Sequence, residues 1–317
     1  MRKFFPRARS WVLASLPLLL AAACDPAPTE PVDSDLRRHA AGKSPSEMIA
    51  FSSDHEGMGR ALYVRVLDGL DVDQRVTSPP AGHGDSEPDF APGSKRLVFT
   101  RTGPDGKTEL YAVGVNGKRL DQLTSFGALT RNPVYSPDGR KIAFVSDKDG
   151  PVDIYVMDAT GANVQRLTST TVADYRPTWS ADGTRLAYAS ADFAQGTRIR
   201  ARDLGTGSES ILVECETAWC TNPTWARNSQ QIIYEISGTP GGPPSLMLRD
   251  LANDVHFVIS AYQTMRVGNW KPDGSRFVAV SDDGSTLYEM VTSNYATGDY
   301  SPMATPSGTV MWPTWSR

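Results

Sequence analysis

Histidines and known catalytic motifs are the obvious sources of chemistry in a sequence, and both are sparse here. The chain contains no G-x-S-x-G, H-E-x-x-H or phosphate-binding glycine loop. Its four histidines lie in separate stretches of the sequence: His39, His55, His83 and His256. Because a zinc site needs three or four ligands, an imidazole cluster is not expected. We therefore predict no catalytic residues, no metal site and no cofactor.

A cysteine follows the long apolar run near the start of the chain. The first nine residues are basic, residues 11–23 are apolar, and small residues lead into Cys24. This layout is typical of a secretory leader over residues 1–23, and the apolar run is too short to span a bilayer.

The small residues before Cys24 also resemble the lipobox of bacterial lipoproteins. In that family a diacylglyceryl group is attached to the cysteine thiol, so the resemblance implies lipidation of Cys24 and anchoring by several acyl chains. The match is imperfect, because the family prefers leucine where this chain has Ala21, and Leu20 is displaced by one position. The alternative is an ordinary leader, cut at residues 21–23, that leaves Cys24 as an incidental thiol.

The two remaining cysteines, Cys215 and Cys220, are close in sequence. In an exported protein such a pair can close a small disulfide loop, whereas a metal site would need more Cys or His nearby. We predict a disulfide, with two free buried thiols as the alternative.

Composition separates the chain into a tether and a globular part. Residues 24–46 are rich in Pro, Ala and charge, which predicts a lipidated, flexible tether with a reach of roughly 25 Å. Hydrophobic residues make up 39% of the whole chain, enough for a buried core. The net charge of -4 counts against a nucleic-acid surface.

One sequence unit recurs through the rest of the chain. Its aromatic anchor returns every 44 to 46 residues, at Phe90, Tyr135, Trp179, Trp225, Trp270 and Trp315. A turn and a short alternating segment follow, as in PVYSPDGRKIAFVS from Pro133, and DIYVMD and QRLTS then supply a third and a fourth strand. Four short antiparallel strands at this period predict the blades of a β-propeller.

The two ends of the sequence hold complementary parts of one unit. Residues 48–53, MIAFSS, form a second strand without a first, whereas no second strand follows Trp315. We therefore expect an all-β, six-bladed propeller over residues 47–317, closed by pairing of the N- and C-terminal segments. Closure of this kind removes exposed sheet edges.

The repeat P-x-W-S-P-D-G, I-A-F-x-S, D-I-Y-V-M-D and L-T resembles that of the TolB-like β-propeller family over residues 47–317. The resemblance implies a bacterial envelope protein, here lipid-anchored with its propeller in the periplasm or at the cell surface. The sequence departs from TolB in having only a short tether where TolB has a separate α/β domain. We therefore expect a stand-alone lipoprotein, and TolB's own partners are not carried over.

Two repeated features are interpreted as structural. The anchor aromatics could stack on sugars, but their recurrence in every unit indicates packing between blades. Asp-Gly pairs such as Asp138-Gly139 suit tight turns, and each offers one carboxylate, whereas calcium takes six to eight oxygens.

Residues that break the repeat are the candidates for function. The loops that join one blade to the next open onto the mouth of the central channel, and the positions three and four before each anchor are irregular. Together with Trp219 from the cysteine loop, they give this candidate binding face: Glu87, Arg131, Asn132, Tyr175, Arg176, Trp219, Asn222, Arg266 and Trp312. A merely solvated rim is the alternative.

These patterns favour a non-enzymatic, monomeric lipoprotein that binds an envelope protein or peptide at the channel mouth. The alternatives are a carbohydrate-active or metal-dependent enzyme that uses the same mouth, and a scaffold without a discrete site. Three or more carboxylates or imidazoles converging in the channel would favour the enzyme, and aromatics with arginine would favour binding.

The anchoring hypothesis predicts that Cys24→Ser releases the protein from membranes into the soluble periplasmic fraction, because lipid attachment needs the thiol. Fractionation and incorporation of an acyl label measure this. Identical fractionation of both proteins, with no label in either, would show that the chain is not a lipoprotein.

Overall fold

The computed structural model describes residues 47–317, apart from the short segments 55–58, 68–71, 193–195, 217, 227, 239–243, 260–264, 272–273, 282, 292–299 and 304–308. The predicted leader, Cys24 and the tether lie outside the described residues. Within the described part, no helix has the length and apolarity needed to cross a membrane.

Six four-stranded antiparallel sheets make up the fold, and we number them as blades 1–6 in chain order. From the innermost strand outward, blade 1 is β24 (Val310–Trp315), β1 (Met48–Ser53), β2 (Ala61–Val66) and β3 (Asp73–Arg75), and blade 2 is β4 (Gly84–Phe90), β5 (Arg96–Thr102), β6 (Thr108–Gly114) and β7 (Asp121–Gln122). Blade 3 is β8 (Thr130–Tyr135), β9 (Lys141–Ser146), β10 (Asp153–Asp158) and β11 (Gln165–Arg166), and blade 4 is β12 (Ala173–Trp179), β13 (Arg185–Asp192), β14 (Gly196–Asp203) and β15 (Glu209–Cys215). Blade 5 is β16 (Trp219–Trp225), β17 (Gln231–Ser237), β18 (Ser245–Asp250) and β19 (Val255–Val258), and blade 6 is β20 (Met265–Trp270), β21 (Arg276–Ser281), β22 (Leu287–Val291) and β23 (Tyr300–Pro302). The prediction of a six-bladed, all-β propeller is confirmed.

The hydrophobic core lies between the blades. Apolar side chains from each blade pack against the next one, so that every seam of the ring has its own buried cluster. All six anchor aromatics belong to these clusters and are at most 9% exposed. A four-stranded sheet cannot bury both of its faces alone, which is why the anchors recur at the seams. Their predicted role in packing between blades is therefore confirmed.

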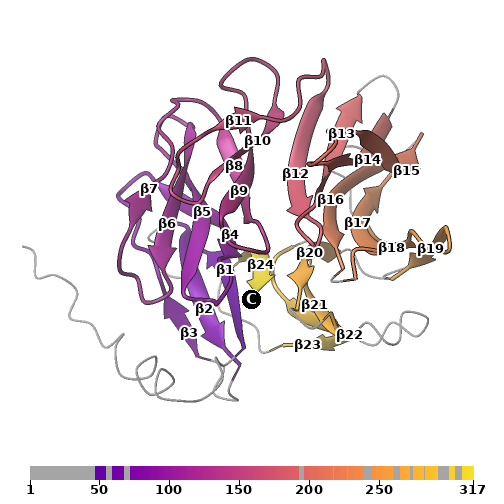
Figure 1. Ribbon diagram of the computed structural model, residues 1–317. Coiled ribbons are helices and arrows are strands. Elements are labelled where there is room, and N and C mark those ends of the chain that lie inside the picture. Colours follow the sequence, from indigo (N-terminus) through magenta and orange to yellow (C-terminus); the bar gives the residue numbers. More distant parts are fainter. Residues whose placement is uncertain are drawn as a thin grey trace, which may run out of the picture.

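Closure of the ring depends on pairing between the two ends of the described chain. In Figure 1 the yellow β24 lies beside the indigo β1, and the register pairs Ile49 with Trp315. Ser316 adds two hydrogen bonds, one from its backbone N–H to the Met48 carbonyl (2.8 Å) and one from the Met48 N–H to its hydroxyl (2.9 Å). Blade 1 therefore combines segments from opposite ends of the sequence, as predicted.

The predicted disulfide between Cys215 and Cys220 is present. It joins the end of β15 to the start of β16, so it connects the outermost strand of blade 4 to the innermost strand of blade 5. The bond thereby ties the start of β16, where Trp219 lies, to blade 4.

The repeated aspartates close the turns after the innermost strands. Asp138 accepts hydrogen bonds from the Ser136 hydroxyl (2.6 Å) and the Arg140 N–H (3.0 Å). Asp182 repeats the arrangement with Ser180 in blade 4, and these hydrogen bonds lower the pKa of Asp182 to about 2. The carboxylates thus bond within their own turns, which fits the structural role predicted for them.

Deletion of residues 309–317 is expected to destabilise the fold severely. It leaves the inner edge of β1 unpaired and removes the fully buried Trp315, a side chain whose loss alone costs about 3–5 kcal/mol. Urea unfolding followed by far-UV circular dichroism measures the effect. Leu120→Ala, at a half-exposed position of blade 2, is the control with a change near zero. A truncated chain that unfolds at the parent's urea concentration would contradict this account of closure.

Candidate functional site: the channel mouth

A β-bulge interrupts each innermost strand. In blade 2 Ser86 pairs with Thr100 and Asp89 pairs with Val98, so Glu87 and Pro88 together oppose a single residue of β5. Blades 1, 3, 4 and 5 shift register at the equivalent point, and blade 6 shifts one residue later, between Val267 and Trp270. A bulge bends the strand and redirects its side chains. Here it occurs where the innermost strands line the central channel.

The first residue of the bulge adopts a positive φ in five of the six blades. These residues, with φ between 49° and 57°, are Glu87, Asn132, Arg176, Asn222 and Trp312. Each precedes a proline, a position normally kept in the extended region, so the conformation is held by its surroundings. Proline has no N–H to leave unpaired, and the channel side of these strands has no neighbouring strand. In each of these five blades, the positive φ turns one side chain toward the channel mouth.

The five residues surround one cavity of about 450 Å³ on the axis of the propeller. The prolines that follow them also line it, as do parts of Trp179, Trp225 and Trp270. This volume is in the range of pockets that hold small ligands or short peptide segments.

Glu87 is the most highly bonded side chain at the mouth. Its Oε2 accepts hydrogen bonds from the Thr100 hydroxyl (2.9 Å) and the Asn132 N–H (2.8 Å), and its Oε1 accepts one from Asn132 Nδ2 (2.5 Å). Arg176 Nη1 lies 3.5 Å from the same Oε1. The Glu87 carboxylate therefore joins blades 2, 3 and 4. Both of its oxygens already accept hydrogen bonds from the protein itself.

Other side chains at the mouth have more binding capacity left. Within the described residues, the long contact to Glu87 is the one ion pair that Arg176 makes, and the Asn222 amide forms no hydrogen bond there. Trp312 is partly exposed, with the guanidinium of Arg60 5.5 Å from its ring centre. A guanidinium, an amide and an indole thus face the cavity together.

A second polar layer lies deeper in the channel. Buried Asp89 accepts a hydrogen bond from the Tyr135 N–H (2.8 Å) and pairs with Arg317 Nη2 (3.0 Å). Burial raises the pKa of Asp89, and the charge of Arg317 opposes that rise. Arg317 Nη1 also donates to the Tyr135 carbonyl (2.9 Å), so this pair links blades 1, 2 and 3. The deeper layer therefore holds neighbouring blades together.

The structure brings together only part of the predicted binding face. Glu87, Asn132, Arg176, Asn222 and Trp312 line the cavity. Arg131 is exposed outside the cavity lining, and Trp219 is partly buried outside it, in the disulfide loop. Tyr175 packs against the clusters on both sides of blade 4 instead of lining the cavity. The Arg266 side chain lies outside the described part.

Sequence reasoning missed the deeper layer. Asp89, Asn269 and Arg317 line the same cavity, although none was a predicted site residue. A polar residue directly before the anchor, as in Asp89 and Asn269, was the available signal, whereas Arg317 lies two residues after the last anchor and had none.

Residues 44–264 match the family described as the TolB beta propeller domain. The chain belongs to this family, as its repeat predicted. Among solved structures, TolB from Acinetobacter baumannii has a TM-score of 0.69 at 20% identity, over 87% of this chain and 67% of that one. Hydrazine synthase from Kuenenia stuttgartiensis gives 0.70 at 12% identity, over 84% of this chain and 46% of that one. Oligogalacturonate lyase from Vibrio parahaemolyticus gives 0.53 at 14%, over 70% and 69%.

At these identities the likenesses show a shared fold alone. The fold of this TolB-family propeller is thus used both by TolB and by proteins named as enzymes. Function has to be argued from the side chains of this chain.

Glu87→Ala is expected to destabilise the protein by about 1–3 kcal/mol, because it leaves the Asn132 N–H and amide without their acceptor inside the ring. Urea unfolding measures the change. Glu214→Ala is the matched control, since its pair with Arg198 is half exposed and such pairs contribute about 0–1 kcal/mol. Equal effects of the two substitutions would mean that Glu87 does not hold the blades together.

Proposed function

We propose that this TolB-family propeller is a non-enzymatic cell-envelope lipoprotein that binds a protein segment or peptide at its channel mouth. The supporting observation is the ring of positive-φ residues: the backbone position repeats, whereas the side chain changes from blade to blade. Strained backbone conformations persist where the surrounding structure holds them and often mark functional sites. A regular scaffold that presents irregular side chains suits recognition better than packing.

The chemistry of the mouth defines the segment that it would accept. Arg176 and Asn222 can donate hydrogen bonds to carbonyl or carboxylate oxygens, and Trp312 offers an apolar surface with a polar edge. Arginine and tryptophan are the residue types most enriched among binding hot spots. An extended segment with backbone carbonyls and one apolar side chain fits this combination.

The location of the protein is part of the proposal. The lipobox-like residues 21–24 would anchor the chain through Cys24, and the tether would hold the propeller away from the membrane. A disulfide between Cys215 and Cys220 agrees with an oxidising compartment outside the cytoplasm.

The enzyme alternative receives less support from the cavity lining. Two described carboxylates, Glu87 and Asp89, line the cavity, and both are already bonded to neighbouring blades. The described part of the lining has no imidazole, and no three His, Cys, Asp or Glu side chains group there in a way that could hold a metal. Arginine with an aromatic ring is the combination that favours binding.

A peptide selected from a random display library on the immobilised full chain tests the proposal. Arg176→Ala and Trp312→Ala are each expected to weaken its binding by about 1–4 kcal/mol, roughly 5-fold to 1,000-fold in Kd, if they act as anchors. Fluorescence anisotropy measures the affinities, and thermal melting confirms that the variants are folded.

Two substitutions outside the cavity serve as controls. Arg140, 85% exposed on a turn, and Trp219, in the disulfide loop, are each replaced by alanine and should leave Kd within about 2-fold. Equal losses at the mouth and control positions, or no loss at either, would overturn the assignment of the mouth. Cleavage of a polysaccharide by the wild-type chain, lost in the mouth variants, would establish the enzyme instead.

A further inference from the structure

Arg60 differs from every other basic side chain that the structure describes. It is partly buried, yet its side chain forms neither an ion pair nor a hydrogen bond with a described residue, and its Nε is shielded from water without a partner. Every other described lysine or arginine side chain has such a contact or is exposed to solvent. Removing charged donors from water without giving them an acceptor is costly, so the position of Arg60 calls for a partner.

Contacts with two blades hold Arg60 at the mouth. Its carbonyl accepts a hydrogen bond from the Asp85 N–H (2.8 Å), which joins the start of β2 to blade 2. Its guanidinium carbon lies 5.5 Å from the ring centre of Trp312, a distance typical of a cation–π contact. The guanidinium therefore lies beside a residue that lines the cavity, and its N–H groups have no acceptor among the described residues.

Arg176 is a second guanidinium with unused donors, on blade 4 across the ring. Its Nη1 lies 3.5 Å from Glu87 Oε1, which already accepts a shorter hydrogen bond from Asn132 Nδ2 (2.5 Å). A guanidinium carries five N–H donors, and those of Arg176 form no hydrogen bond within the described part of the chain. Blades 1 and 4 face each other in a ring of six, so the two guanidinium groups lie on opposite sides of the mouth.

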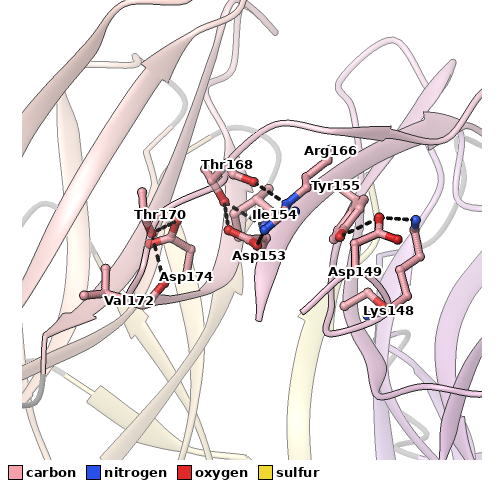
Figure 2. Close-up of polar contacts among 11 residues, drawn as sticks. Lys148, Asp149, Asp153, Ile154, Tyr155, Arg166, Thr168, Thr170, Val172 and Asp174 are labelled. Atoms are coloured by element: carbon pink, nitrogen blue, oxygen red, sulfur yellow. Dashed lines mark hydrogen bonds and ion pairs between the residues drawn. The ribbon is translucent and has the colours of Figure 1, made fainter. Parts of the chain in front are cut away.

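Cations elsewhere in the ring bond to carboxylates of the same chain. Figure 2 shows two such pairs in blade 3, Arg166 with Asp153 and Lys148 with Asp149. Both pairs lie within bonding distance, and the Arg166 pair holds the outermost strand of its blade against the third strand. The two guanidinium groups at the mouth have no bonded carboxylate of this kind.

The carboxylates of the cavity do not supply the missing partner. Glu87 and Asp89 are the carboxylates of the described lining. Asp89 pairs with Arg317 (3.0 Å), and Glu87 balances one positive charge at most, through its long contact with Arg176. The charge of Arg60 therefore has no counterpart in the described lining. Unbalanced charge at the entrance of a cavity attracts ligands of the opposite sign.

We propose that the segment bound at the channel mouth is acidic and that two of its carboxylates bind Arg60 and Arg176; this identification rests on the proposed function. A carboxylate accepts two parallel hydrogen bonds from the planar fork of a guanidinium. Glu87 lies on blade 2, between the two arginines in the order of the blades, so the segment would place a neutral residue there. A polymer with a negative charge on every unit, such as nucleic acid, fits this arrangement less well.

Selection from a random peptide display library on the immobilised full chain gives the first test. Asp and Glu should be enriched among the peptides recovered on the wild-type protein. The enrichment should fall on Arg60→Gln and on Arg176→Gln proteins, because each substitution removes one of the two charges. Arg140→Gln is the matched control, since Arg140 is 85% exposed outside the cavity lining, and it should recover the same acidic peptides.

A double-mutant cycle with one recovered peptide tests the individual contacts. Replacing the Asp or Glu that binds Arg60 by Asn or Gln should weaken binding to the wild-type protein by roughly 10-fold or more. The same replacement should have little further effect on Arg60→Gln protein, because the partner is already absent. Arg60→Lys keeps the charge without the fork, so it should retain part of the affinity. Raising NaCl from about 50 to about 500 mM should weaken the wild-type complex several-fold.

The melting temperature distinguishes ligand binding from a structural role. Because Arg60 has no bonded partner among the described residues, Arg60→Gln should melt at the temperature of the parent or above it. A large fall in melting temperature would show that the guanidinium stabilises the fold, and it would overturn the assignment of Arg60 to a ligand.

The remaining outcomes separate this proposal from the proposed function. Recovered peptides that depend on Trp312 but show no enrichment of Asp or Glu would overturn the acidic segment and leave binding at the mouth intact. Recovery of no peptide that depends on the mouth would overturn both. Equal losses of affinity in Arg60→Gln and Arg140→Gln would indicate a general effect of charge, and preferential binding of a DNA fragment at the mouth would indicate a polyanion instead.

Discussion

Burial of one large aromatic side chain at every seam is the interaction on which the rest of this structure depends. A four-stranded blade has two apolar faces, and neither can be covered within the blade. The anchors, together with the apolar positions of the second and third strands, cover each face with the next blade. The outer face of the last blade can be covered in this way only if the ring closes. Trp315 and the pairing of β24 with β1 meet that requirement with residues from opposite ends of the chain.

Closure also creates the channel, because the six innermost strands must then face one axis. Each of these strands has a neighbour on one side only, and the bulges and prolines prevent another strand from pairing on the open side. The same bulges present Glu87, Asn132, Arg176, Asn222 and Trp312 to the cavity. The feature that protects the inner edge of the blades is thus also the one that displays variable side chains. The side chains at the bulges therefore differ from blade to blade, whereas the anchor aromatics at the seams recur.

Charges within the seams follow a different rule from charges at the mouth. The pair of Asp85 and Arg101 is fully buried and bonds through both carboxylate oxygens. Asp174 occupies the same place in blade 4 without such a partner, so the repeat provides an internal comparison in which the scaffold is the same and one charge is absent. At the mouth, by contrast, Glu87 balances Arg176 only over a long contact and uses its other bonds on neutral groups. The seam charge of Asp85 is thus closed within one ion pair, whereas side chains at the mouth keep donor groups without such a partner.

The amino-acid sequence by itself determined the blade count, the order of the strands and the closure of the ring. This was possible because the anchor spacing and the strand alternation are local patterns that recur six times, and because residues 48–53 lack a first strand. It also located the mouth positions three residues before each anchor. Only the tertiary structure decided which of these residues meet: the bulge turns Arg176 toward the cavity and leaves Tyr175 between blades. The partners of Glu87 were likewise invisible in the sequence, since they come from different blades and no spacing along the chain records such a contact.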